Sequence, residues 1–202
     1  TGVFGLYDLI GIDLMADVLK SFIKELPEND AFQIVAKEIP LVKKLIETGY
    51  TGRKGKGGFY RINKTDNKKI LEAINLETGE YSTSQKINLG SEKMDLNNLI
   101  NREDKYGKYA WSVISKIIKY ASSLVPGITD KFNDIDEAMR LGFNWTIGPF
   151  EMLKSIGVKN FFNRVDDFKG NKFLEELSVK KDENFYGERQ IYTKIETLGK
   201  VK

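Results

Sequence analysis

Residues 147–158 read IGPFEMLKSIGV, and residues 1–12 read TGVFGLYDLIGI. The two phrases align without a gap, and four positions are identical: Gly2/Gly148, Phe4/Phe150, Ile10/Ile156 and Gly11/Gly157. The second copy follows a long stretch of helical pattern, whereas the first copy opens the chain. We therefore interpret the chain as a tandem repeat of one helical unit whose first copy lacks its front. We expect it to be a fragment of a longer polypeptide.

The amino-acid composition limits the kinds of fold and site that this chain can form. A chain of 202 residues, 41% hydrophobic and 30% charged, can bury a core in one domain or in two small ones. It contains no Cys and no His, which excludes disulfides, a Ser-His-Asp triad and zinc sites built on these ligands. We therefore expect no metal site and no catalytic residue in this chain.

Charge and hydropathy bear on location and partners. The net charge of +3 is too small to demand an anionic polymer as partner. We find no signal peptide and no run of about 18 apolar residues, so we expect a cytoplasmic protein without a membrane span. Abundant Lys, Ile and Asn are typical of an AT-rich bacterial genome.

Periodicity predicts a mainly α chain. Apolar side chains recur at helical spacing over residues 6–26 and 105–125, with Pro27 and Pro126 as stops. Shorter helices are expected from Pro40 onward, near 133–141, from Pro149 and within 158–178. Gly49 should cap the helix that begins at Pro40, and Asn133 or Asp134 should cap the helix near 133–141.

The middle of the chain is different. Residues 59–62 and the run 69–80 favour short strands, with a turn at Glu77–Gly79. Residues 82–103 are polar and are predicted to be a linker. We therefore expect a first helical unit at 1–62, a hairpin and linker at 63–103, and a second helical unit with a tail at 104–202.

Two segments carry a family resemblance. One reads DIDEAMRLGFNWTIGPFEML (134–153), and the other reads GRKGKGGFY (52–60) after PLVKKLIETG (40–49). Both resemble the C-terminal domain of NAD-dependent 3-hydroxyacyl-CoA dehydrogenases of fatty-acid β-oxidation, whose patterns are D-x-x-x-x-x-G-x-x-x-x-x-G-P-F and G-[RK]-K-x-G-x-G-F-Y. The hairpin sequence ILEAINLETGEY (70–81) is similar to the long bacterial form with two such domains in tandem.

The first segment is interpreted as structural. Gly142 and Gly148 should permit close turns, and Phe150 and Trp145 should fill a seam between helices. Asp134 and Asp136 are not expected to form a catalytic pair, because side chains at i and i+2 diverge on a helix. Near a helix start, they are more plausibly caps that meet the helix dipole.

The second segment is the candidate site. Its glycines expose backbone N–H groups, and Arg53, Lys54 and Lys56 add positive charge, so an anion could bind there. In the family, the second basic position of this motif contacts the bound NAD, and Lys54 occupies that position. Lys56 departs from the pattern, which has a glycine there. The second unit lacks this loop, and only Phe185-Tyr186 matches its end.

The resemblance implies the C-terminal part of an enzyme that oxidises 3-hydroxyacyl-CoA to 3-oxoacyl-CoA. NAD would be bound mainly by an N-terminal nucleotide-binding domain that this chain lacks, together with the catalytic His–Glu pair. The chain would shape the acyl-CoA cleft and supply a dimer-like repeat interface, and alone it would be inactive. In the long bacterial form, an enoyl-CoA hydratase domain can be fused in the same polypeptide.

Two alternatives remain open. A non-catalytic helical scaffold that binds a protein would also explain a repeat. A nucleic-acid binder could use the basic stretch 53–69, where seven basic residues accompany the single acid Asp66. The balanced charge elsewhere argues against nucleic acid.

Overall fold

The computed structural model describes residues 2–65, 68–85, 95–180 and 185–186. Contacts divide the chain into two compact units, Thr1–Asn88 and Leu89–Lys202, which are described separately here as unit 1 and unit 2. The described residues form ten helices and one three-stranded antiparallel sheet. The prediction of a mainly α fold is confirmed.

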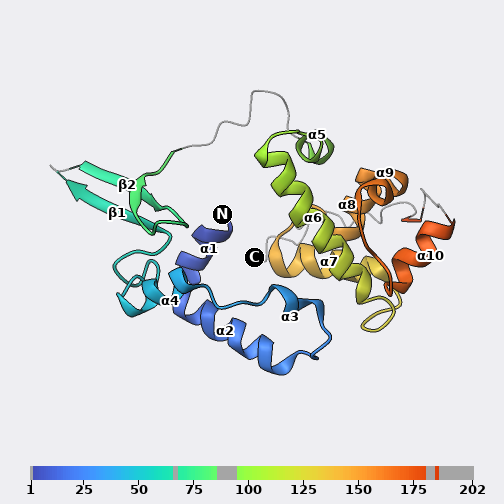
Figure 1. Cartoon of the computed structure of the whole chain (residues 1–202), viewed down its shortest axis with the longest axis horizontal. Coiled ribbons are helices and arrows are strands. Elements are labelled where there is room, and N and C mark those ends of the chain that lie inside the picture. Colours follow the sequence, from blue (N-terminus) through green and yellow to red (C-terminus); the bar gives the residue numbers. More distant parts are fainter. Residues whose placement is uncertain (1, 66–67, 86–94, 181–184, 187–202) are drawn as a thin grey trace, which may run out of the picture. The chain divides into compact units, whose positions relative to one another are not determined.

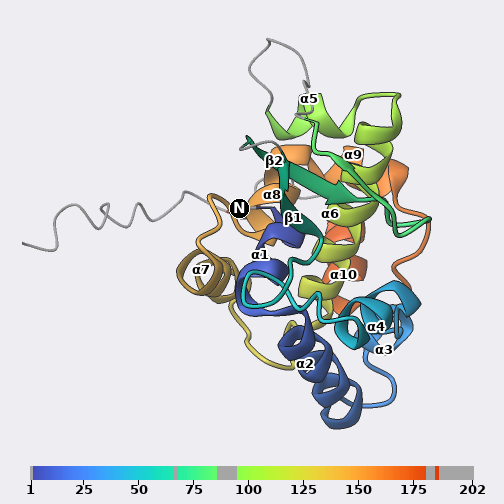
Figure 2. The same cartoon turned by 90° about the vertical axis from the view of Figure 1, so that its left-hand side faces the viewer.

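Unit 1 consists of four helices followed by the sheet (Figures 1 and 2). The elements are α1 (Val3–Ile10), α2 (Ile12–Glu25), α3 (Ala31–Val35), α4 (Pro40–Glu47), β1 (Tyr60–Thr65), β2 (Lys68–Ile74) and β3 (Tyr81–Thr83). Helix α4 packs against α2, and α1 contacts β1. Ile12, Leu45 and Phe59 form the small buried core.

The prediction of a single helix over residues 6–26 is wrong, because Gly11 divides this segment into α1 and α2. Gly11 has φ 118° and ψ 124°, a conformation that residues with a side chain rarely adopt. Gly157, its match in the second phrase, has φ 87° and ψ 134° and likewise separates two helices. The two copies of the phrase therefore share the same helix–glycine–helix corner.

Several local predictions for unit 1 are confirmed. Pro40 opens α4, and Gly49 follows its end at φ 82°. A turn with Gly79 at φ 75° joins β2 to β3, and β1 pairs with β2 in the register Tyr60↔Ala73. Helix α3 was not predicted. The carboxylate of Asp30 caps it by accepting the N–H of Phe32 at 2.7 Å.

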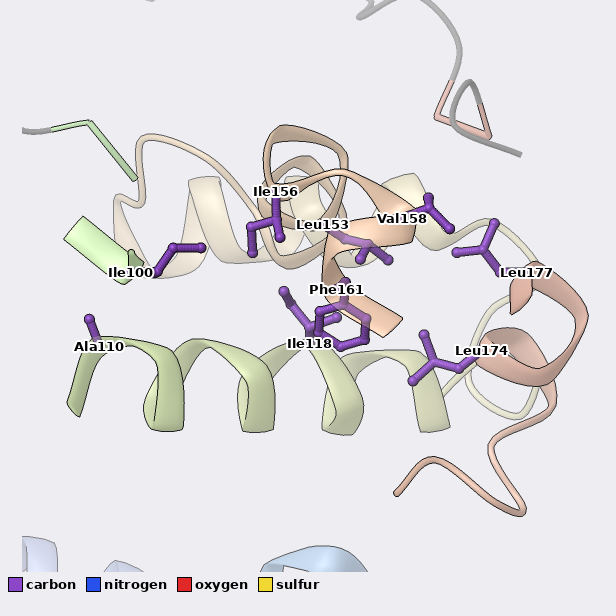
Figure 3. Packing of buried hydrophobic residues seen from close by; sticks show 9 residues of the cluster. All are labelled: Ile100, Ala110, Ile118, Leu153, Ile156, Val158, Phe161, Leu174 and Leu177. Carbon is purple, nitrogen blue, oxygen red and sulfur yellow. The ribbon is translucent and has the colours of Figure 1, made fainter. Parts of the chain in front are cut away.

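Unit 2 is helical in its described part. Its elements are α5 (Leu96–Ile100), α6 (Lys105–Ser123), α7 (Phe132–Phe143), α8 (Pro149–Ile156), α9 (Val158–Arg164) and α10 (Lys172–Lys180). Figure 3 shows side chains of α6 pointing toward those of α8, α9 and α10, with Ile118 and Phe161 near the centre. Both of these side chains are fully buried.

Two predictions for unit 2 need correction. The polar pattern over 82–103 predicts a linker. Residues 86–94 lie outside the described part of the chain, but further on Asp95 caps α5 and Ile100 is buried in the core of unit 2. Helix α7 begins at Phe132 with Lys131 at the N-cap position, so neither Asn133 nor Asp134 caps it. The Asp134 carboxylate accepts instead from the Thr129 hydroxyl at 3.1 Å.

The two phrases differ in what covers them. Phe150 is completely buried, with the rings of Phe132 and Phe173 at 5.2 and 5.1 Å. Phe4 is 40% exposed, and its ring packs against that of Phe59 in a tilted arrangement with the ring centres 4.7 Å apart. The repeat predicts equal environments for these two rings. The structure contradicts this, because α7 covers the phenylalanine in unit 2 and the described part of unit 1 has no counterpart of α7.

Candidate functional site

The glycine-rich loop Gly52–Gly58 connects α4 to β1 and closes on itself. The N–H of Gly52 donates to the carbonyl of Gly57 at 2.8 Å, and these two residues form an isolated β-bridge. Gly52 and Gly57 have φ 103° and 134°, so both positions require glycine. The loop is therefore a compact turn rather than an open strand.

The backbone N–H groups of this loop are mostly occupied. Those of Gly52, Arg53, Gly55, Lys56 and Gly58 all donate to carbonyl groups of the chain. The expectation that these N–H groups face an anion is therefore wrong, since backbone bonds that shape the turn already use them. An anion at this loop would therefore depend mainly on side chains.

Asp8 of α1 connects both ends of the loop. Its carbonyl accepts the N–H of Arg53 at 2.7 Å, and its carboxylate accepts the N–H groups of Phe59 and Tyr60, each at 2.8 Å. Asp8 is only 4% exposed. Gly58 has no room for a side chain, because a Cβ atom there would overlap the Asp8 carboxylate.

Lys54 lies over the corner between α1 and α2. Its ammonium forms an ion pair with the Asp13 carboxylate at 2.8 Å, and the side chains are 54% and 37% exposed. A Cβ atom on Gly11 would come within 3.0 Å of Lys54 Cε, so the glycine makes room for this pair. The Lys54 ammonium lowers the pKa of Asp13, chiefly through their hydrogen bond.

Two further basic residues of the stretch 53–69 have structural contacts. Lys56 donates to the carbonyl of Thr48 at 3.0 Å and so satisfies the end of α4. Arg61 pairs with Glu72 across the hairpin at 2.6 Å. With Lys54, three of the seven basic residues of this stretch are thus directed to partners within the chain, which reduces the number of cations available to a nucleic acid.

Tyr81 of β3 fixes the loop from the sheet side. Its hydroxyl donates to the carbonyl of Gly58 at 2.5 Å, and the Arg61 guanidinium lies 3.9 Å from the centre of its ring. The Tyr50 ring stacks on it at 5.7 Å. Burial raises the pKa of Tyr81 to about 12, since the phenolate would lose its hydration.

The raised pKa of Tyr81 predicts a pH dependence of stability. An unfolded tyrosine ionises near pH 10, so the folded state loses stability as the pH rises from about 10 to about 12, while below pH 10 the contribution is complete. The Tyr81→Phe variant should show a smaller loss of unfolding free energy between pH 9 and 11.5 in urea titrations. Tyr60→Phe, an exposed tyrosine of β1, is the control. Equal slopes in wild type and Tyr81→Phe would contradict the assignment.

Comparison with known proteins finds relatives of the segment that contains the loop. Residues 1–62, which include the loop, match the family described as the C-terminal domain of 3-hydroxyacyl-CoA dehydrogenase. A Rickettsia felis protein named as a fatty acid oxidation complex trifunctional enzyme is 43% identical over 165 residues, which are 82% of this chain and 22% of that protein. Over residues 1–62 this chain is similar to the C-terminal domain of 3-hydroxyacyl-CoA dehydrogenases, and the Rickettsia felis relative extends the similarity to 165 residues.

Other relatives carry related names. A Rickettsia prowazekii protein with the same name is 41% identical over 165 residues, again 82% of this chain and 22% of that protein. A Bacillus subtilis protein named as a 3-hydroxyacyl-CoA dehydrogenase is 28% identical over 198 residues, which are 92% of this chain and 24% of that protein. The chain thus spans roughly a fifth to a quarter of the length of these relatives. No solved structure gives a significant match.

Unit 2 lies outside the family match of residues 1–62, and it uses its own motif for structure. The buried carboxylate of Asp136 accepts the N–H groups of Phe150 and Glu151 at 2.8 and 3.1 Å. The Glu151 carboxylate in turn accepts the N–H of Gly148 at 2.8 Å and pairs with Arg140 at 2.6 Å. Asp136 therefore caps α8, the following helix, and not its own.

The tail residue Tyr186 joins this cluster. It is 6% exposed and hydrogen-bonds to Asp136. Burial raises the pKa of Asp136, although the N–H groups that it accepts oppose the change. Burial also raises the pKa of Tyr186, and the bond to Asp136 adds to this. A carboxylate so fully occupied by helix amides and a phenol serves as a cap, which supports the structural interpretation of this motif.

Some residues of the site were not found from the sequence. Asp8, Asp13 and Tyr81 lie around the loop, but none of them belongs to the motif that indicated it. The repeat contained a signal for the two aspartates. When the alignment of the two phrases is extended by one residue, Lys154 lies opposite Asp8 and Lys159 lies opposite Asp13, so the charge at both positions differs between the copies.

The described residues contain no helix that is long and apolar enough to cross a membrane. In the same part of the chain, no three side chains among His, Cys, Asp and Glu gather closely enough to hold a metal ion.

Proposed function

We propose that this chain is the C-terminal part of an NAD-dependent 3-hydroxyacyl-CoA dehydrogenase of bacterial fatty-acid oxidation, with Lys54 as a cofactor contact. The observation that carries the proposal is the Lys54 side chain, which is half-exposed above a loop fixed by Asp8 within the segment that matches the family. The whole enzyme would oxidise 3-hydroxyacyl-CoA to 3-oxoacyl-CoA, and this region would help to wall the acyl-CoA site.

The donor set of the loop fits a single phosphate contact. Side chains are the main donors for an anion, because most backbone N–H groups of the loop are bonded within the chain. The Lys54 ammonium has three donors and uses one toward Asp13, so it can keep this partner and bind a phosphate oxygen. NAD would supply the hydride acceptor, and its main binding surface would lie in a nucleotide-binding domain outside this chain.

The names of the relatives support further proposals about the whole protein. The word trifunctional in the Rickettsia names fits additional catalytic domains, which we propose include an enoyl-CoA hydratase. We also propose a cytoplasmic location. With no His in its 202 residues, this chain alone is expected to be inactive as a dehydrogenase.

The test is a substitution of Lys54 in the complete enzyme. Loss of a partly exposed ammonium–phosphate contact is worth about 1–2 kcal/mol, so Lys54→Ala should raise the KM for NADH by about ten-fold. The kcat should change less, because the groups that transfer the proton and hydride lie elsewhere. Steady-state rates of acetoacetyl-CoA reduction at varied NADH concentrations measure both constants.

Lys56→Ala is the matched control. It removes a neighbouring lysine of the same loop whose ammonium is directed to the carbonyl of Thr48. Its KM for NADH should stay close to that of the wild type. If Lys54→Ala also leaves this KM unchanged, Lys54 is a surface residue and the proposed cofactor contact is wrong.

A further inference from the structure

Asp8 contacts the glycine loop near its start and just after its end. Its backbone carbonyl holds Arg53, next to Lys54, and its carboxylate holds Phe59 and Tyr60 where the loop enters β1. The carboxylate is buried and accepts two backbone N–H groups that would otherwise lack a partner away from water. Loss of either bond would free the loop to change its path.

The internal repeat provides an independent comparison. At the positions that align with Asp8 and Asp13, unit 2 has Lys154 and Lys159, so both charges are reversed. Lys154 lies 5.5 Å from the ring of Tyr186, which matches Tyr60 at the end of the loop in unit 1. No glycine-rich basic sequence precedes Tyr186. The two aspartates thus accompany the basic loop in one copy, and the copy without this loop has neither.

From these contacts we infer that Asp8 is a positioning residue, which sets the path of the loop and thereby the place of Lys54. Asp13 completes the arrangement by holding the ammonium over the Gly11 corner. Asp8 itself touches no cofactor, because its carboxylate is buried beneath the loop and faces the backbone of Phe59 and Tyr60. The inference rests on the proposed contact between Lys54 and the cofactor.

The test combines Asp8→Asn with Lys54→Ala in the complete enzyme. The asparagine keeps the shape of the side chain but presents an amide N–H₂ to one of the two N–H groups. Asp8→Asn should raise the KM for NADH by about three- to ten-fold with little change in kcat. In the double mutant, Asp8→Asn should add nothing to the effect of Lys54→Ala, because the two residues act through one contact.

A second measurement does not depend on activity. Amide hydrogen exchange of residues 52–60 in the 202-residue chain should become faster in Asp8→Asn, whereas exchange in α6 of unit 2 should not change. Asp17→Asn makes the same charge change on the exposed side of α2, where Asp17 is 73% exposed, and should leave both the KM and the exchange unchanged. If Asp8→Asn fails to fold, Gly58→Ala replaces it, since the added Cβ displaces the carboxylate without removing its charge.

The outcomes separate the two hypotheses. If Lys54→Ala raises the KM but Asp8→Asn leaves it unchanged, or if the two effects add, the positioning role of Asp8 is overturned. If Lys54→Ala has no effect on the KM, the proposed cofactor contact fails. Exchange of residues 52–60 then decides whether Asp8 sets the loop, and an unchanged rate in Asp8→Asn overturns that as well.

Discussion

Phe150→Ala is expected to destabilise unit 2 by about 3–5 kcal/mol, the range measured for large aromatic side chains removed from protein cores. Phe150 has no exposed surface and contacts Phe132 of α7 and Phe173 of α10. Its removal leaves a cavity between α7, α8 and α10. The cavity lies at the end of α8 that the buried Asp136 carboxylate caps. Urea unfolding followed by tryptophan fluorescence measures the change, because both tryptophans of the chain, Trp111 and Trp145, lie in unit 2.

Phe4→Ala is the matched control from the other copy of the phrase. Because the Phe4 ring is 40% exposed, its removal should cost clearly less than that of Phe150, about 1 kcal/mol. The rule for buried rings does not extend to Trp111, which is only partly buried and stacks under the Arg164 guanidinium at 3.9 Å. An unfolding midpoint of Phe150→Ala equal to that of the wild type would show that this core is not formed as described.

Gly148→Ala is expected to destabilise unit 2 by about 3 kcal/mol, at the upper end of the range for overpacked sites. A Cβ atom on Gly148 would overlap both the carboxylate and the Cα atom of Asp136. The backbone of α7 cannot move away without releasing the cap on α8. Steric overlap and loss of the cap therefore act together.

Gly142 offers a control in the same motif. It lies within α7, and a Cβ atom there would have no neighbour within 4 Å. Gly142→Ala should therefore stabilise the helix by about 0.5–1 kcal/mol. The two glycine variants are expected to shift the urea midpoint in opposite directions. A shift of the same sign for both would refute the assignment of Gly148 as the residue that makes room for Asp136.

The features of the fold that could be predicted depend on local signals. Pro40 and Gly49 mark the ends of α4, Pro149 marks the start of α8, and the apolar pattern of 105–125 predicts α6. These signals work because capping and periodicity involve residues within one or two turns of each other. The family motif likewise indicated the loop and Lys54, although the role of Lys54 stays a prediction.

The features that could not be predicted depend on contacts between distant residues. Asp8 meets Phe59 across 51 residues, and Asp136 caps a helix that begins 13 positions later. Gly142 and Gly148 look alike in the sequence, and only the position of Asp136 makes the second one obligatory. The break at Gly11 was also missed, because apolar residues continue at helical spacing on both sides of it.

The reversed charges of the two phrases have a consequence for inheritance. Similar sequences within one gene are targets for recombination, and here gene conversion across the phrase and the residue after it would place lysines at positions 8 and 13. Two lysines would then lie beneath Arg53 and Lys54, and the N–H groups of Phe59 and Tyr60 would face a cation instead of a carboxylate. Such hybrids would lose both carboxylates that hold the loop and Lys54, so divergence at these two positions disfavours any exchange between the copies.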